Sequence, residues 1–182
     1  MTNQAKLNNY FGTVWRDNHY ALANYQFSGP ALVDRIQEGE RVIDIGCGTN
    51  QFKGHIPNLL GIDPAFPEAD YQLSLEDYAA SNTMVRFNVA FCLGSINFGS
   101  KENIENQINI ITKLLRRKCG ARIYWRCNPG RKDHPNTECE GIEFYPWSFE
   151  EHERLATLFN FSITEIEWDS NNRIFAEWVW LT

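Results

Sequence analysis

Two glycines and two aspartates, each at the end of an apolar run, carry the most chemistry in this sequence. The segment VIDIGCG puts Asp44, Gly46 and Gly48 at the end of the first run, and GIDP puts Asp63 at the end of the next. Glycine has no Cβ, so the backbone can turn tightly and lie against a ligand. A carboxylate after the second run can accept hydrogen bonds from both hydroxyls of a ribose. The pattern predicts an adenosine-type ligand with free ribose hydroxyls.

The same turn lacks the features that hold a pyrophosphate. A dinucleotide site needs G-x-G-x-x-G, whose third glycine packs a long helix with its N-terminus toward the phosphates. Here the segment reads GCGTNQ, and Gly54 and Pro57 interrupt any helix that follows. The crossover from Gly46 to Asn58 has 13 residues, near the shortest that joins parallel strands. No G-x-x-x-x-G-K-[ST] loop occurs either. A ligand with ribose and adenine but no phosphate fits better.

Alternating strands and helices must bring these residues together. β-branched and apolar runs predict seven strands, at residues 41–45, 59–63, 70–73, 87–94, 121–127, 162–168 and 173–181. Apolar stripes and capping residues predict helices at 29–39, 101–120 and 148–160. The last two strands are joined by DSNN, which predicts an antiparallel hairpin.

The fold expected from these elements is α/β. It is a single Rossmann-like, doubly wound, mostly parallel seven-stranded sheet with helices on both faces and a C-terminal antiparallel hairpin. In such sheets the ligand lies beyond the carboxyl ends of the strands, at the switch point. The turn at 46–50 is expected to be that point.

We expect residues 1–29 to form an N-terminal aromatic and helical cap, and residues 30–182 to form the Rossmann-like domain. The first segment is rich in aromatic and amide side chains and has no clean period. Tyr10, Trp15 and His19 either line a lid over the ligand or simply close the sheet, and the sequence leaves both interpretations open.

Composition narrows the class of protein. The 182 residues carry a net charge of −6, with 43% hydrophobic and 22% charged residues, as in an ordinary globular domain. The polar N-terminus and the absence of 18 consecutive apolar residues predict no signal peptide and no membrane span. Five cysteines, an odd number at irregular spacing, favour free thiols in a reducing cytoplasm. No metal site is expected, because the residues that could be combined into one include no CxxC pair: Cys119, Cys127, His134 and Cys139.

The two motifs together resemble those of the class I S-adenosylmethionine-dependent methyltransferases. The resemblance runs from about residue 30 to residue 182 and includes the expected strand order. It implies that the chain is an enzyme that uses S-adenosyl-L-methionine as its cofactor. The acidic charge and the sequence GSIN after the fourth strand, where DNA adenine methyltransferases carry [DNS]-P-P-[YFW], argue against duplex nucleic acid. A small-molecule methyl acceptor is therefore expected.

The resemblance also implies where the methionine part of the cofactor lies. Gly46, Cys47 and Gly48 would lie beneath it. Asp44 would orient this turn and meet the cofactor's amino group through the backbone or water. Cys47 is expected to be a small packing residue rather than a nucleophile.

The adenosine part would lie beyond the second strand. By the resemblance, Asp63 holds the ribose and Pro64 lies beside the adenine. Either Glu76 or Asp77 lies near the adenine amino group. Asp63 could instead only cap the turn that follows it, but the upstream glycines favour the ribose role.

Leu93 and Gly94, at the end of the fourth strand, would touch the cofactor and face the substrate. Asn50 and Phe52 are expected to replace some contacts of the shortened first helix. No general base is identified, since methyl transfer from a sulfonium depends mainly on positioning. The sequence offers five candidates for a base or for substrate positioning: His19, Asn97, Arg126, His134 and Tyr145.

Two rival functions remain. One is a nicotinamide-dependent oxidoreductase, but the missing third glycine and the short crossover argue against it. The other is a non-catalytic module that keeps the fold to bind an adenosyl ligand or a partner. The sequence determines neither the acceptor atom nor the oligomeric state.

Overall fold

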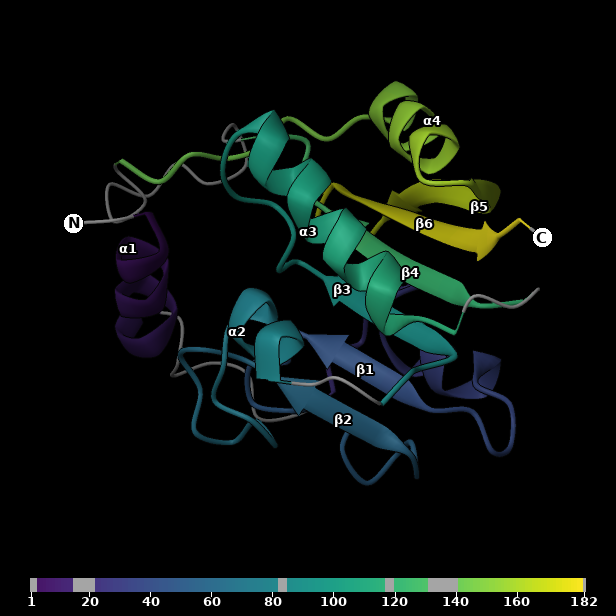
Figure 1. Ribbon diagram of the computed structural model, residues 1–182, viewed down its shortest axis with the longest axis horizontal. Coiled ribbons are helices and arrows are strands. Elements are labelled where there is room, and N and C mark those ends of the chain that lie inside the picture. The colour runs from purple at the N-terminus through teal and green to yellow at the C-terminus, as the bar shows by residue number, and fades with distance from the viewer. Residues whose placement is uncertain (1–2, 15–21, 82–84, 117–119, 131–140, 182) are drawn as a thin grey trace.

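The β-branched and aromatic runs assemble into one mixed sheet (Figure 1). The computed structural model describes residues 3–14, 22–81, 85–116, 120–130 and 141–181. Across the sheet the strand order is β2-β1-β3-β4-β6-β5. β1 is parallel to β2 and β3, and β3 is parallel to β4, whereas β6 is antiparallel to both β4 and β5. The strands are β1 (Val42–Ile45), β2 (Leu59–Ile62), β3 (Val89–Leu93), β4 (Arg122–Cys127), β5 (Phe161–Asp169) and β6 (Arg173–Trp180).

The α/β class predicted from the sequence is confirmed, but the strand predicted at 70–73 does not form. That segment meets β2 only at a bridge between Ile62 and Tyr71. The Asp70 carboxylate accepts a hydrogen bond from the Gly61 N–H at 2.8 Å, so a side chain takes the place of a strand carbonyl. Among the described residues the sheet therefore has six strands rather than seven.

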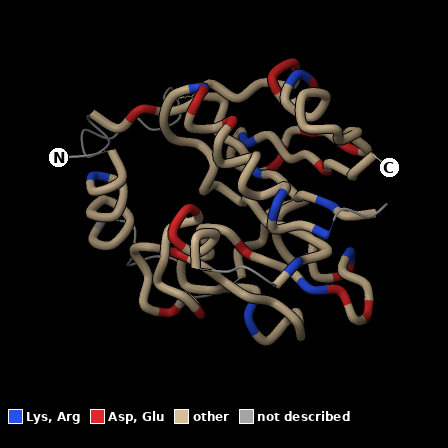
Figure 2. Tube along the Cα trace, viewed as in Figure 1, with Lys and Arg blue, Asp and Glu red and all other residues tan. Residues whose placement is uncertain are grey.

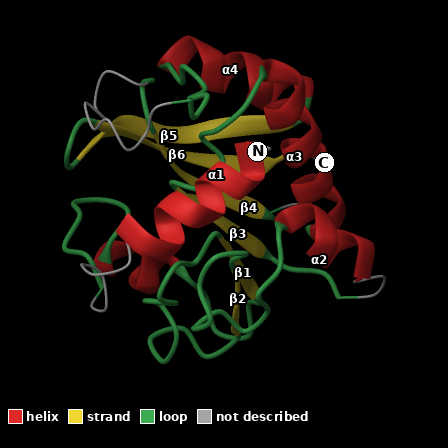
Figure 3. Cartoon of the chain, turned by 90° about the vertical axis from the view of Figure 1, so that its left-hand side faces the viewer, coloured by secondary structure: helices red, strands yellow, loops and turns green. Residues whose placement is uncertain are grey.

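Helices cover both faces of the sheet and its carboxyl edge. α2, α3 and α4 lie on one face, and η3 packs on the other (Figures 1 and 3). α1 crosses in front of the carboxyl ends of the strands (Figure 3). None of the helices within the described ranges is long and apolar enough to cross a membrane. The helices are α1 (Asn3–Asn9), η1 (Tyr10–Val14), η3 (Pro30–Arg35), α2 (Leu75–Ser81), α3 (Lys101–Leu114) and α4 (Phe149–Leu158).

The long helix predicted over 101–120 ends earlier, at Leu114. Leu115 leaves the helix to form a bridge with Phe87. The Arg116 N–H then donates to the Phe87 carbonyl at 2.8 Å. A contact with a distant part of the chain thus ends the helix, and helical periodicity alone does not reveal it.

Side chains of the strands alternate between two apolar cores. Ile43 and Trp125 point to the core beneath α2, α3 and α4. Phe91 and Tyr124 point to the opposite core, which also contains Leu32 of η3. All five are at most 1% exposed. Burial of each such side chain contributes about 1.5–3 kcal/mol, and the two cores fix the sheet whose edge forms the site.

Candidate functional site

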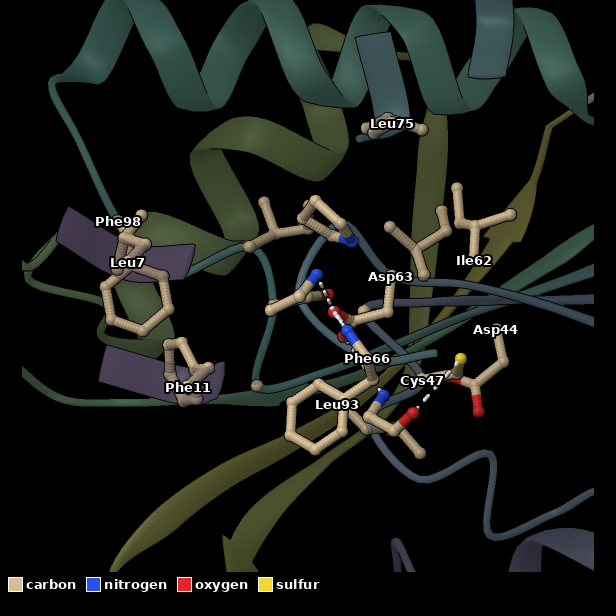
Figure 4. A pocket seen from close by; sticks show the side chains of 18 of the residues that line it. Leu7, Phe11, Asp44, Cys47, Ile62, Asp63, Phe66, Leu75, Leu93 and Phe98 are labelled. Carbon is tan, nitrogen blue, oxygen red and sulfur yellow. Dashed lines mark hydrogen bonds between the residues drawn. The ribbon is translucent and has the colours of Figure 1, made fainter. Parts of the chain in front are cut away.

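A cavity of about 450 Å³ lies at the carboxyl edge of the sheet, between the turn after β1 and α1 (Figure 4). Parts of the chain that are far apart in sequence line it, including α1, the loops after β1, β2 and β3, and the start of α2. The switch point predicted at 46–50 is therefore beside the cavity. Nine of the ten residues that the resemblance assigned to the cofactor line its wall: Asp44, Gly46, Cys47, Gly48, Asp63, Pro64, Glu76, Leu93 and Gly94.

The glycine turn is shaped by a close approach and by its backbone conformation. Gly46 and Gly48 have φ angles of +71° and +55°, in the left-handed region that glycine adopts without strain. A Cβ at Gly46 would lie 2.3 Å from the Cβ of Ser95, so no larger residue fits there. The N–H groups of Gly46 and Cys47 both donate to the Ile62 carbonyl, at 2.8 and 3.1 Å. The turn is thus held against the end of β2.

Asp63 both caps its own turn and lines the cavity. Its Oδ1 accepts the N–H groups of Ala65 and Phe66, at 2.8 and 3.2 Å. Its Oδ2 accepts the Gly48 N–H at 3.0 Å, which ties the two predicted motifs together. Burial raises the pKa of this carboxyl, and the three N–H groups oppose the shift. A carboxylate offers about four acceptor positions, so it has room for a further donor from a ligand.

Asp44 is a buried carboxyl in the same wall. It is 4% exposed. Burial, and secondarily the charge of Asp63, raise its pKa to about 7. No hydrogen bond from the described residues offsets this shift. A cationic group in the cavity would favour the ionised form of this carboxyl.

Glu76 and Asp77, the two acids at the start of α2 that the sequence left as alternatives, have different surroundings in the structure. Glu76 lines the cavity and accepts a hydrogen bond from the Gln107 side chain at 3.2 Å. Asp77 is not part of the lining. Its N–H donates to the Ser74 hydroxyl at 3.1 Å, and its carboxylate accepts the hydroxyl proton of Ser74 at 2.7 Å. Asp77 therefore stabilises the start of the helix.

Three of the candidates for a base or for substrate positioning lie within the described residues, and two of them are held by structural contacts. Asn97 is fully buried, donates to the Gly94 carbonyl at 2.8 Å and accepts the Asn128 N–H at 3.0 Å. The Tyr145 hydroxyl donates to Glu151, outside the cavity lining. Arg126 lines the cavity.

Several predictions fall outside the described residues. They concern Trp15, His19, His134, Cys119 and Cys139. Within the described part of the chain, no group of three or more His, Cys, Asp or Glu side chains could hold a metal ion.

Two further expectations concern Cys47 and the residues after the glycine turn. Burial raises the pKa of the Cys47 thiol, which fits a packing residue rather than a thiolate nucleophile. Phe52 lines the cavity. Asn50 lies behind it, with a φ of +58°, and its side chain donates to the Glu68 carbonyl at 3.2 Å. It stabilises the loop after β2.

The sequence did not reveal the apolar chamber beneath α1. Leu7 and Phe11 line this part of the cavity with Phe98, as Figure 4 shows. The rings of Phe11 and Phe98 meet edge to face, with centroids 5.7 Å apart. Tyr10 is buried in the same apolar cluster. α1 has only seven residues, which is too short for a periodic signal, so the sequence pattern did not identify Leu7 as a lining residue.

Comparison with known proteins gives similarity in structure alone. No family model matches the chain, and no curated protein matches its sequence. Magnesium protoporphyrin IX methyltransferase (ChlM) from Synechocystis PCC 6803 with bound SAM superposes with a TM-score of 0.69. The identity is 15%, over 100% of this chain and 98% of that one.

Two further structures show the same likeness. 1,6-didemethyltoxoflavin-N1-methyltransferase from Burkholderia thailandensis, with its substrate and S-adenosylhomocysteine bound, gives a TM-score of 0.68 at 14% identity. It covers 98% of this chain and 89% of that one. The N-methyltransferase NodS from Bradyrhizobium japonicum WM9, with S-adenosylhomocysteine, gives 0.56 at 12% identity, over 79% of each chain. At these identities the likeness establishes a shared fold.

Proposed function

We propose that this chain, which has the fold of the class I S-adenosylmethionine-dependent methyltransferases, binds S-adenosyl-L-methionine and transfers its methyl group to a small molecule. The observation that carries the proposal is the single cavity wall in which the glycine turn, Asp63 and Asp44 meet. The hydrogen bond between the Gly48 N–H and Asp63 joins the two predicted motifs, which supports one ligand for both.

The cofactor would occupy the wall in a defined direction. The methionine part lies over Gly46 and Gly48, and Asp44 faces its amino group. A ribose hydroxyl donates to the acceptor position that remains on Asp63. The adenine lies near Pro64 and Glu76. All of these residues line the same cavity, which supports the assignment.

The chain needs little acid–base chemistry to promote this reaction. The bound cofactor supplies an activated methyl group on a sulfonium. Positioning an acceptor for in-line attack can contribute effective molarities on the order of 10⁵–10⁸ M. The protein's own part is to hold the acceptor beneath α1, next to Leu93 and Gly94, and to exclude water. The apolar side chains of Leu7, Phe11 and Phe98 suit that task.

The chamber beneath α1 favours a small acceptor with apolar or aromatic surface, because aromatic rings and an aliphatic side chain line it. Two of the similar structures are methyltransferases of small molecules, magnesium protoporphyrin IX and 1,6-didemethyltoxoflavin. Duplex nucleic acid fits poorly. In Figure 2 acidic residues lie beside basic ones on α4 and in the segment before β1, and the net charge is −6.

The proposal also includes the division into a cap at 1–29 and a domain at 30–182, and a cytoplasmic location. α1 at the cavity mouth supports the cap. Cys47, Cys92 and Cys127 are free thiols, as a reducing compartment would keep them.

Calorimetric titration of the purified protein with S-adenosylmethionine, S-adenosylhomocysteine and NADH tests the cofactor. We expect micromolar binding of the two adenosyl ligands and none of NADH. Binding of NADH alone would establish an oxidoreductase instead. A screen of small aromatic acceptors for S-adenosylhomocysteine release then tests catalysis. Tight binding without release for any acceptor would favour the non-catalytic module.

A further inference from the structure

Three strands present Asp44, Leu93 and Arg126 on one face of the sheet, at its carboxyl edge. Side chains alternate along a strand, so each residue shares the face of the one two positions earlier. Those earlier residues, Val42, Phe91 and Tyr124, all belong to the same core cluster. Asp44, Leu93 and Arg126 all line the cavity.

The pairing of the strands sets the spacing of these residues. Asp44 is paired with Phe91, and Leu93 is paired with Arg126. Neighbouring strands are 4.7–4.9 Å apart, so β1 and β4 are separated by about 10 Å with β3 between them. Along the strands Asp44 is level with Phe91 and Arg126 with Leu93, an offset of two residues or about 7 Å. An anionic and a cationic side chain thus lie on either side of β3, within reach of one small ligand.

Arg126 has donors to spare. Its side chain is 11% exposed. One terminal N–H donates to the Ser170 carbonyl at 3.0 Å. Its Nε is buried without a hydrogen-bond partner, 3.6 Å from an Asp169 oxygen. The guanidinium lies over the Tyr25 ring, 3.9 Å from its centroid. A guanidinium has five N–H donors in a planar fork, so most of them have no protein acceptor among the described residues.

Asp169, the nearest carboxylate to Arg126, is largely used by other donors. It accepts the N–H groups of Phe27 and Ser28, at 3.1 and 3.3 Å, and the Ser28 hydroxyl. Its carboxylate therefore fixes the segment before η3 and leaves the Arg126 fork incompletely paired. The positive charge at this end of the cavity remains suited to an anion.

We propose that Arg126 holds the carboxylate of the cofactor's methionine part, while Asp44 faces the ammonium of the same amino-acid group. The assignment rests on the proposed function. An α-amino acid group carries the two opposite charges that the Asp44–Arg126 pair complements. A carboxylate on the methyl acceptor has the same chemistry, and the ligand pair used in the test separates these two sources.

The test compares two ligands that differ only in that carboxylate. These are S-adenosylhomocysteine and its decarboxylated form, S-adenosyl-3-thiopropylamine, titrated into the wild-type protein by calorimetry. We expect the wild type to prefer S-adenosylhomocysteine by about 10- to 100-fold, the range for a charge-assisted hydrogen bond. In Arg126→Gln the preference disappears, because affinity for S-adenosylhomocysteine falls while that for the amine changes little. Arg126→Lys, which keeps the positive charge, should retain part of the preference for S-adenosylhomocysteine.

Arg122→Gln is the matched control. Arg122 lies on the same strand and the same face, and its side chain is similarly buried, at 12% exposed. It pairs with Glu40 at 2.7 Å, outside the cavity lining. This variant is expected to keep the full preference for S-adenosylhomocysteine.

Three results would overturn the assignment. If Arg126→Gln keeps the wild-type preference, another group reads the carboxylate. If it weakens both ligands equally, Arg126 only supports the fold. If the wild type binds both ligands equally well, Arg126 does not bind the cofactor's carboxylate, and a carboxylate on the methyl acceptor becomes its expected partner. A wild-type protein that binds neither ligand would instead overturn the proposed function itself.

Discussion

Gly48 gives the most direct test of where a ligand lies. Its φ is +55°, and no heavy atom lies within 4 Å of the place where a Cβ would be. Because Gly48 lines the cavity, the methyl group of Gly48→Ala would take up space beside a ligand. We expect this variant to bind S-adenosylhomocysteine at least tenfold more weakly, as calorimetry would show. The left-handed conformation would also cost about 1–2 kcal/mol of stability.

Gly39 provides the control for that strain. Its φ is +80°, its surroundings are equally open, and it is not part of the cavity lining. Gly39→Ala should lose similar stability in urea unfolding and keep full affinity. Equal affinity in both variants would mean that the ligand does not contact the turn.

Asp44 should make cofactor binding depend on pH. Its pKa of about 7 in the folded protein means that it is mostly protonated at pH 6 and mostly ionised at pH 8. An ammonium group binds the ionised form, so affinity for S-adenosylhomocysteine should rise by up to about tenfold across this range. Asp44→Asn should flatten the profile. A flat profile in the wild type would place the ammonium elsewhere.

At the scale of single residues, local sequence patterns predicted which residues belong to the site, but they did not predict all the hydrogen bonds that those residues make. Asp63 could be recognised because an acid follows an apolar run. Its bonds to Ala65 and Phe66 lie within its own turn, the capping role that the sequence left open, whereas its bond to Gly48 forms only when the two loops meet. Glu76 and Asp77 are equivalent in sequence, and they separate because neighbours on a helix point about 100° apart.

At the scale of elements, α4 carries a histidine inside an aromatic cluster. His152 is fully buried, and its ring centroid lies 4.5 Å from that of Trp147 and 5.6 Å from that of Trp178. Neither ring nitrogen has a hydrogen-bond partner among the described residues. Burial lowers its pKa to about 3, so the folded protein keeps it neutral where the unfolded chain protonates it.

The sign of the pH effect follows from this depressed pKa. The contribution of His152 to the free energy of unfolding is complete above pH 6.5 and is lost as the pH falls from 6.5 toward 3. Between pH 7.5 and pH 5 His152 should contribute about 2 kcal/mol to this loss, whereas the raised pKa of Asp44 acts in the opposite direction. The His152 contribution is therefore measured in urea unfolding as the difference between the pH dependence of the wild type and that of His152→Phe, and substitution of the exposed His55 by Gln should leave the wild-type dependence unchanged. A slope unchanged in His152→Phe would contradict the prediction.

Element boundaries show why sequence prediction stops at tertiary contacts. The isoleucine stripe of α3 predicted the helix, and its start at Lys101 agrees with the predicted range of 101–120. Its end was not predictable, because Leu115 leaves to pair with Phe87, which is distant in sequence. The segment at 70–73 has strand-like composition, but the Asp70 side chain takes the β2 hydrogen bond that a strand would use.

At the scale of the molecule, ligand binding joins segments that are far apart in the chain. The cavity lining includes α1, the turns after β1 and β2, the loop after β3 and the end of β4. A ligand at 100 times its dissociation constant adds about 2.7 kcal/mol to stability. For a domain of this size we expect S-adenosylhomocysteine to raise Tm by about 5–10 °C. Scanning calorimetry with NADH as control checks this, and an unchanged Tm with saturating S-adenosylhomocysteine would contradict it.

The missing strand also has a consequence for how the protein behaves at high concentration. An edge strand with unpaired N–H and C=O groups is a template onto which another chain can add and start an aggregate. On the outer edge of β2 three of these groups are already bound: the Gly61 N–H by Asp70, the Gly61 carbonyl by the Tyr71 N–H and the Leu59 carbonyl by the Lys53 ammonium. Two side chains and one backbone N–H thus oppose intermolecular β-sheet growth on this edge, as a further strand would have done.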